Sequence, residues 1–197
     1  MAVRDQQKAF QASAERDGVA LHGPHNRTWL TGRGHVGLVD LDPTVAQVLD
    51  KILDVLDGDR VVHAEKSPRR LSSDFIHLHS STWVEFDEVQ HFTSWRLLTL
   101  QMYPDGLAGL TDVAEYSQLC EEWSPKADGA WRNKPAAGFP GPSGRARQRA
   151  YFDAVRDLCV PAMTGETIIR VPAPGLTGDA AWSRYGDRVR TATGVPG

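Results

Sequence analysis

Three acidic side chains in one short stretch of this chain have types and spacing suited to holding a metal ion. Asp74 precedes one strand-like run, and Glu85 and Asp87 alternate with apolar residues in the next. Successive side chains of a strand point to opposite faces, so Glu85 and Asp87 share a face, while Val84 and Phe86 point into a core. Carboxylates held this close destabilise a sheet unless a cation lies between them. Mg²⁺ is typically held by one or two carboxylates and a substrate phosphate. The stretch therefore predicts a site for a divalent cation.

We expect the two runs to form a hairpin. With residues 80–81 as a two-residue turn, Ile76 pairs with Glu85, and Asp74 pairs with Asp87. All three acidic side chains then lie on one face of the hairpin.

Helical patterns surround these strands. Asp42, followed by Pro43, is typical of a helix N-terminus, and the helix is expected to end before Gly58. Asp112 is expected to begin another helix that reaches Trp123. Three further helices are expected over residues 5–16, 93–104 and 145–159, strands over 60–66 and 167–171, and loops over 22–35 and 124–144.

Size and composition favour one main domain. With 197 residues, 41% of them apolar, the chain is large enough to bury one substantial core. We expect an N-terminal arm over residues 1–41, a core domain over 42–171 and a C-terminal tail over 172–197. No run approaches the roughly 18 apolar residues of a membrane span, and the start does not resemble a signal peptide, so a cytoplasmic protein without membrane contact is expected. The isolated Cys120 and Cys159 are expected to be buried free thiols.

The acidic motif and the order of elements resemble those of the PD-(D/E)xK, or restriction-endonuclease-like, nuclease superfamily. The chain is most similar there to small nucleases related to the very-short-patch mismatch-repair endonucleases. Their pattern is an Asp-Phe pair, a spacer and Glu-x-Asp-Gly-x-x-His, which Asp74-Phe75, Glu85-Phe86-Asp87 and His91 match. The resemblance implies an α/β fold with a central mixed sheet flanked by helices, in the order helix, three strands, helices, strand.

The motif departs from the family pattern at three positions. Ser73 replaces a proline, Glu88 replaces the glycine, and Asp87 stands where a lysine would follow Glu85. Some restriction enzymes carry a Glu-x-Gln variant, so Glu88 and Gln90 are an alternative second half of the motif. Strand alternation favours Glu85 and Asp87, because Glu88 has the opposite parity unless the strand bulges.

The resemblance also implies roles for the motif residues. Asp74 and Glu85 would bind Mg²⁺, for which Mn²⁺ substitutes, and Asp87 would complete the coordination or orient the attacking water. Gln90 and His91 would position phosphate or transfer a proton. Basic residues that could contact DNA phosphates lie before Asp74 and along one side of the 145–159 helix, namely Lys66, Arg69, Arg70, Arg145, Arg149 and Arg156.

These features predict a Mg²⁺-dependent endonuclease that hydrolyses DNA phosphodiester bonds in restriction, phage defence or DNA repair. A homodimer, or a partner protein of such a system, is also compatible with the sequence. One alternative is a nuclease-derived module that binds nucleic acid or a partner without cutting, the missing lysine marking lost catalysis. A second alternative is an α/β domain whose acidic cluster is only a solvated surface.

Overall fold

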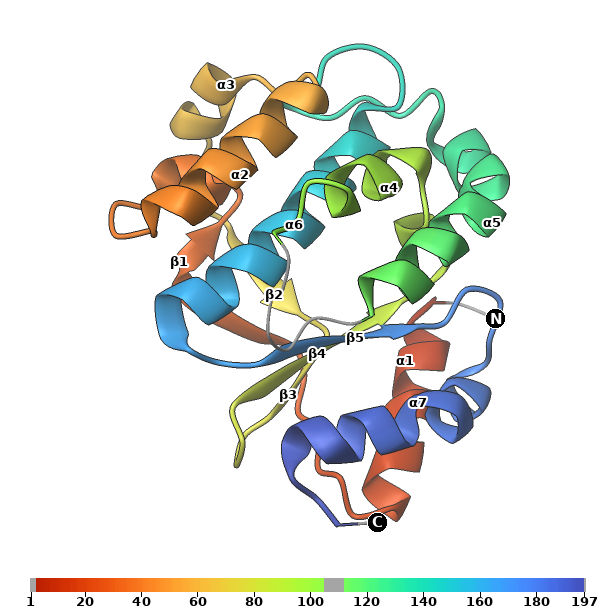
Figure 1. The fold of residues 1–197 in the computed structure, drawn as a ribbon. Coiled ribbons are helices and arrows are strands. Elements are labelled where there is room, and N and C mark those ends of the chain that lie inside the picture. Colours follow the sequence, from red (N-terminus) through yellow and green to blue (C-terminus); the bar gives the residue numbers. More distant parts are fainter. Residues whose placement is uncertain (1–2, 105–111, 197) are drawn as a thin grey trace.

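The structure, a computed structural model, describes residues 3–104 and 112–196. Its central sheet has the strand order β3-β4-β5, formed by β3 (Phe75–His77), β4 (Thr82–Asp87) and β5 (Ile168–Pro172). Strand β4 runs antiparallel to β3 and parallel to β5. A separate antiparallel sheet pairs β1 (His25–Thr31) with β2 (Arg70–Ser73). The expected α/β class is confirmed, with one mixed and one antiparallel sheet flanked by helices (Figure 1).

One face of the central sheet is covered by α6 (Gly144–Thr164), which crosses the middle of the molecule in Figure 1. Leu158 of this helix lies in the larger hydrophobic core together with Trp83 of β4 and Ile168 of β5. The helical elements between the two terminal helices also include α2 (Pro43–Val55), α3 (Arg60–Glu65), α4 (Ser94–Leu100), α5 (Val113–Trp131) and the short 3-10 helices η1 (Gly34–Gly37) and η2 (Val89–His91).

The opposite face of the sheet is covered by the two ends of the chain. Helix α1 (Val3–Arg16) packs against α7 (Gly178–Thr193) beneath the strands (Figure 1). Phe10 of α1 contacts Phe86 of β4 and Trp182 of α7, with ring centroids 5.2 and 5.5 Å apart. The segments expected as an N-terminal arm and a C-terminal tail thus supply one layer of the core.

Helices with strong local capping signals begin where the sequence predicts. The Asp42 carboxylate accepts hydrogen bonds from the backbone of Thr44 and Val45 at the start of α2. Asp112 caps α5 in the same way. Helix α4 and strand β5 also form close to their expected positions. Cys120 and Cys159 are buried free thiols, as expected.

Three expectations about local structure are wrong. The strand expected over 60–66 is helix α3, because the Asp59 carboxylate caps this helix by accepting a hydrogen bond from Val62 N. Val61, expected to be buried in a sheet, is 65% exposed. The loop expected over 22–35 contains β1, whose partner β2 lies far along the chain. Helix α5 extends to Trp131, into the first part of the loop expected over 124–144, because the ring of Pro125 lies on an exposed face and Ala127 anchors the next turn in the interior.

No helix within residues 3–104 and 112–196 is both long and apolar enough to cross a membrane.

Candidate functional site

Strand β4 places Glu85 and Asp87 on the face covered by α6, as strand alternation predicts. Val84 and Phe86 point to the other face and pack in the core that includes α1 and α7. Arg156 of α6 reaches Glu85, with its Nε 3.2 Å from the carboxylate oxygen Oε1. The two acidic side chains therefore face the interior between the sheet and α6.

The hairpin register differs from the predicted one by two residues. Ile76 pairs with Trp83, and Phe75 pairs with Val84, because residues 78–81 form a four-residue connection with Ser81 at a φ of 54°. A shift of two residues keeps the side chains of the paired positions on their predicted faces. It moves the neighbour of Asp74, however, from Asp87 to Glu85.

Asp74 lies one position beyond the last pair of the hairpin. Its Oδ2 accepts a hydrogen bond from Phe86 N at 2.9 Å, and its Oδ1 accepts one from Gln7 Nε2 of α1, also at 2.9 Å. Burial raises the pKa of Asp74; the Phe86 hydrogen bond acts against this, and the negative charge of Asp87 adds to it. Asp74 therefore ends the hairpin and links it to α1.

Glu85 is 2% exposed. Burial raises its pKa to about 8, although the positive charge of Arg156 acts in the opposite direction. Its Oε1 is buried and accepts no hydrogen bond. At neutral pH this side chain is therefore largely protonated in the folded protein.

Asp87 is fully buried and its carboxylate is bound by several donors. Its Oδ2 accepts hydrogen bonds from Arg170 Nη1 at 2.8 Å and from the Tyr116 hydroxyl, and His91 Nδ1 lies 3.1 Å from Oδ1. Burial disfavours the charged form, but Arg170 and His91 outweigh this effect and lower the pKa of Asp87. Asp87 is therefore an ionised carboxylate within an ion-pair network.

His91 joins this network through both ring nitrogens. Its Nδ1 lies 2.9 Å from Asp153 Oδ2 on α6, and its Nε2 lies 2.8 Å from Arg149 Nη1. A guanidinium has only donors, so Nε2 accepts the hydrogen bond from Arg149 and the ring proton sits on Nδ1, toward the carboxylates.

The alternative motif pair lies next to the network: Glu88 is the N-cap residue of η2, and Gln90 lies within this helix. Gln90 Nε2 donates a hydrogen bond to Glu88 Oε2 at 2.9 Å, so the two side chains bind each other. Burial raises the pKa of Glu88. Neither residue lies on β4, because the strand ends at Asp87.

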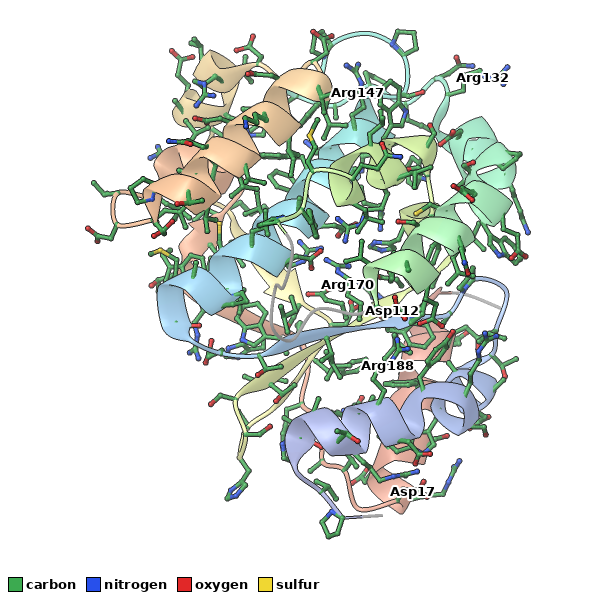
Figure 2. The ribbon with its side chains drawn as sticks, viewed as in Figure 1. Asp17, Asp112, Arg132, Arg147, Arg170 and Arg188 are labelled. Atoms are coloured by element: carbon green, nitrogen blue, oxygen red, sulfur yellow. The ribbon has the colours of Figure 1, made fainter. Side chains whose placement is uncertain are left out.

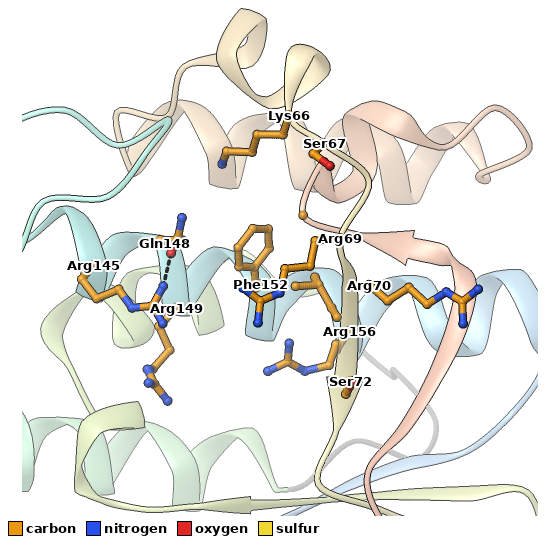
Figure 3. A pocket seen from close by; sticks show the side chains of 12 residues that line it. Lys66, Ser67, Arg69, Arg70, Ser72, Arg145, Gln148, Arg149, Phe152 and Arg156 are labelled. Carbon is orange, nitrogen blue, oxygen red and sulfur yellow. Dashed lines mark hydrogen bonds between the residues drawn. The ribbon is translucent and has the colours of Figure 1, made fainter.

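All six basic residues predicted to contact phosphate line one pocket of about 670 Å³. One wall is formed by β2 and the segment before it, and the other by α6 (Figure 3). The lining consists of Lys66, Arg69, Arg70, Arg145, Arg149 and Arg156, together with Gly32, Ser67, Leu71, Ser72, Gln148 and Phe152. The structure thus brings together two basic groups that are distant in sequence.

Two of these arginines connect the pocket to the side of β4 that carries Glu85 and Asp87, which we call the acidic face. Arg149 lines the pocket and donates to His91, while Arg156 lines the pocket and pairs with Glu85. Arg156 also donates to Asp153 Oδ1 at 3.0 Å. Arg149 and Arg156 therefore belong both to the pocket and to the surroundings of the acidic face.

Several residues of the network were missed by sequence reasoning. Arg170 of β5, shown between the central sheet and the overlying helices in Figure 2, binds Asp87 and donates from Nε to Asp157 Oδ1 at 2.7 Å. Arg96 of α4 donates to the other oxygen of Asp157 at 2.6 Å. An arginine within the apolar run of β5 was the available signal, because a charge on a buried strand needs a partner.

Within the part of the chain that the structure describes, no group of three or more His, Cys, Asp or Glu residues is arranged to hold a metal ion. The three acidic side chains of the predicted site do not form one cluster. Asp74 and Glu85 lie at neighbouring positions, while the Asp87 carboxylate is already bound by Arg170, Tyr116 and His91. Any cation here would therefore rely on two carboxylates and on ligands from outside the chain.

Residues 51–178 match a family of unknown function, DUF7255, and the chain belongs to this family. The matched range contains Asp74, Glu85, the whole of α6 and Arg170. It also contains every pocket residue except Gly32. No curated protein and no solved structure matches the chain.

Proposed function

We propose that this protein is a nuclease of restriction-endonuclease-like fold that binds DNA in the pocket between β2 and α6 and hydrolyses phosphodiester bonds at the adjoining carboxylates. The observation that carries the proposal is the double role of Arg149 and Arg156, which line the pocket and contact His91 and Glu85. A phosphate bound by these arginines would lie beside the groups suited to hydrolysis.

The arrangement of strands also supports this proposal. The central sheet is mixed and flanked by helices, as the resemblance implies: the antiparallel hairpin β3-β4 is followed by helices and by the parallel strand β5. Of the three strands expected before these helices, the one over 60–66 is helix α3 instead. Asp74 and Glu85 occupy the two positions that correspond to the acidic motif of the superfamily. Their proximity raises the pKa of Glu85 further, after the larger effect of burial.

The residues fit a two-carboxylate cation site. Glu85 Oε1 is a buried oxygen without a hydrogen bond, and Asp74 lies at the neighbouring position of the hairpin. Mg²⁺ prefers oxygen ligands and needs only one or two carboxylates when phosphate supplies others. Asp74 and Glu85 would hold Mg²⁺, which would neutralise phosphate charge and lower the pKa of a bound water.

The chain's own residues would perform the remaining tasks. Arg149 and Arg156 would bind the phosphate and stabilise the charge that develops on its oxygens. When Arg149 turns from His91 to the phosphate, Nε2 of His91 would become free to take a proton. Asp153, 2.9 Å from Nδ1, would then stabilise the charged imidazole ring.

The alternative is a module that binds nucleic acid without cutting it. The observation that favours it is the guanidinium of Arg156 beside Glu85, which supplies positive charge where a metal ion would. In this case Arg156 and Glu85 would be a structural pair.

Cleavage of DNA in the presence of Mg²⁺ or Mn²⁺, measured against a chelator control, tests the proposal. We expect Asp74→Asn and Glu85→Gln to abolish cutting and to retain binding. Asp179→Asn, which changes an exposed carboxylate on α7, should cut like the wild type. Salt-sensitive binding without cutting of any single-stranded, duplex, mismatched or modified DNA would favour the binding module. Absence of any DNA binding would overturn both functions.

A further inference from the structure

The pocket between β2 and α6 has the size of a site for a small ligand. Its volume of about 670 Å³ lies within the range of roughly 300–1,000 Å³ that is typical of such pockets. A double helix keeps its bases stacked between two backbones, so it could only touch the rim of a cavity of this size. A single nucleotide without a pairing partner could enter.

The chemistry of the lining differs from that of a simple phosphate site. Phe152 of α6 is half-buried and its ring lies among the basic side chains of the pocket (Figure 3). Leu71 of β2 adds apolar surface on the other wall. Arg69 and Arg145 are exposed on opposite walls, so both can meet a nucleic-acid backbone. The pocket therefore combines an aromatic face with basic groups on both sides.

Lys66 is held close to this aromatic face. Its Nζ lies 5.7 Å from the ring centroid of Phe152, 5.9 Å from that of Phe139, and 3.1 Å from His63 Nε2. Among residues 3–104 and 112–196, no carboxylate forms an ion pair with Lys66. Burial lowers its pKa to about 8. A cation with this environment can bind an anion or a base carbonyl without first breaking an internal ion pair.

We infer that the pocket receives an unpaired nucleotide of single-stranded DNA, with its base stacked on Phe152 and its phosphates bound by the surrounding arginines. Proteins that bind single strands combine a basic groove with aromatic side chains on which bases stack. This inference rests on the proposed function and names its substrate: single-stranded DNA, or a strand with an unpaired nucleotide, is bound in preference to intact duplex.

Equilibrium binding, measured by fluorescence anisotropy in the presence of a chelator, tests the inference. Three labelled probes of equal length are compared: an oligothymidylate, a duplex, and an abasic strand with the same number of phosphates. We expect the oligothymidylate to bind more tightly than the other two. The abasic strand isolates stacking, because it retains the backbone charge but lacks the bases.

A pair of matched variants locates the stacking surface. Phe152→Leu should weaken oligothymidylate binding by roughly 5- to 150-fold, the range that corresponds to loss of one stacked base. Phe139→Leu is the control, because Phe139 contacts the same lysine but is fully buried and does not line the pocket. It should leave affinity unchanged.

Equal affinity for the oligothymidylate, the abasic strand and the duplex would overturn the inference. If Phe152→Leu failed to fold, the comparison of the three probes on the wild-type protein would still decide the question. Duplex binding that is salt-dependent and insensitive to Phe152→Leu would leave the proposed nuclease standing and remove only the preference for single strands. Failure to bind any probe would contradict the proposed function itself.

Discussion

At the scale of single residues, the acidic face is a set of carboxylates in different protonation states. Glu85 and Asp87 lie two positions apart on one strand, yet burial raises the pKa of Glu85, while Arg170 and His91 lower that of Asp87. The sequence predicts that these side chains share a face, because strand alternation is a local property. Arg170 and Asp153 could not be assigned to them, because a buried ion pair depends on which distant elements pack together.

Glu85 predicts a specific dependence of stability on pH. Its pKa is raised from 4.5 to about 8 in the folded protein, so the folded state holds a proton that the unfolded chain releases. This contribution to stability is complete below about pH 4.5 and is lost as the pH rises through about 8. The side chain of Glu85→Gln stays neutral at every pH. The melting temperature of this variant minus that of the wild type should therefore be several degrees higher at about pH 8.5 than at about pH 5.

Thermal unfolding of both proteins at the two pH values measures this effect. Glu121→Gln is the matched control, because it makes the same change of side chain on the exposed side of α5. A Glu85→Gln difference that is the same at both pH values would show that Glu85 is ionised in the folded protein.

At the scale of elements, β5, α6 and α4 are joined by charged side chains in the interior. Arg170 of β5 binds Asp87 and Asp157, and Arg96 of α4 binds Asp157 from the other side. A buried charge that loses its partner is costly, since no water replaces the missing contact. These arginines therefore hold α4 and α6 in place over the acidic face.

Arg170→Met should destabilise the protein strongly, by about 3–5 kcal/mol, because it leaves the buried carboxylates of Asp87, Asp153 and Asp157 without this partner. Arg16→Met is the control: Arg16 forms an ion pair with Asp179, but both side chains are exposed, so the expected loss is below about 1 kcal/mol. Urea denaturation gives both values. Equal losses would mean that the interior network adds no more stability than a surface pair.

Elements were predictable from the sequence where their signals are local. Asp42 and Asp112 cap α2 and α5 at the predicted positions, since a capping carboxylate acts on its own first turn. Strand β1 was missed because its pairing with β2 depends on a segment some 40 residues away. The hairpin register was wrong by two residues because the length of its connection has no strong signal in residues 78–81.

At the scale of the whole molecule, the distribution of charge matters more than its sum. The net charge is -3, yet six basic side chains gather in one pocket. Three of them come from α6, of which Arg149 and Arg156 also reach His91 and Glu85, and the other three come from the opposite wall (Figure 3). A protein with this arrangement should bind a polyanion at one place and not over its surface.

This arrangement predicts how salt affects DNA binding. Each phosphate neutralised by the protein releases condensed counterions, so the logarithm of the binding constant falls linearly with the logarithm of the salt concentration. Changing Arg69 and Arg145 together to Gln should reduce the magnitude of this slope by about 1–2 units, because each is an exposed cation on a different wall of the pocket. Arg16 and Arg184 are exposed elsewhere on the molecule, and changing them together to Gln removes the same charge. The magnitude of the slope should fall only for the variant with both Arg69 and Arg145 changed. Equal changes in the two variants would mean that DNA is attracted by the overall charge, which would contradict a binding site between β2 and α6.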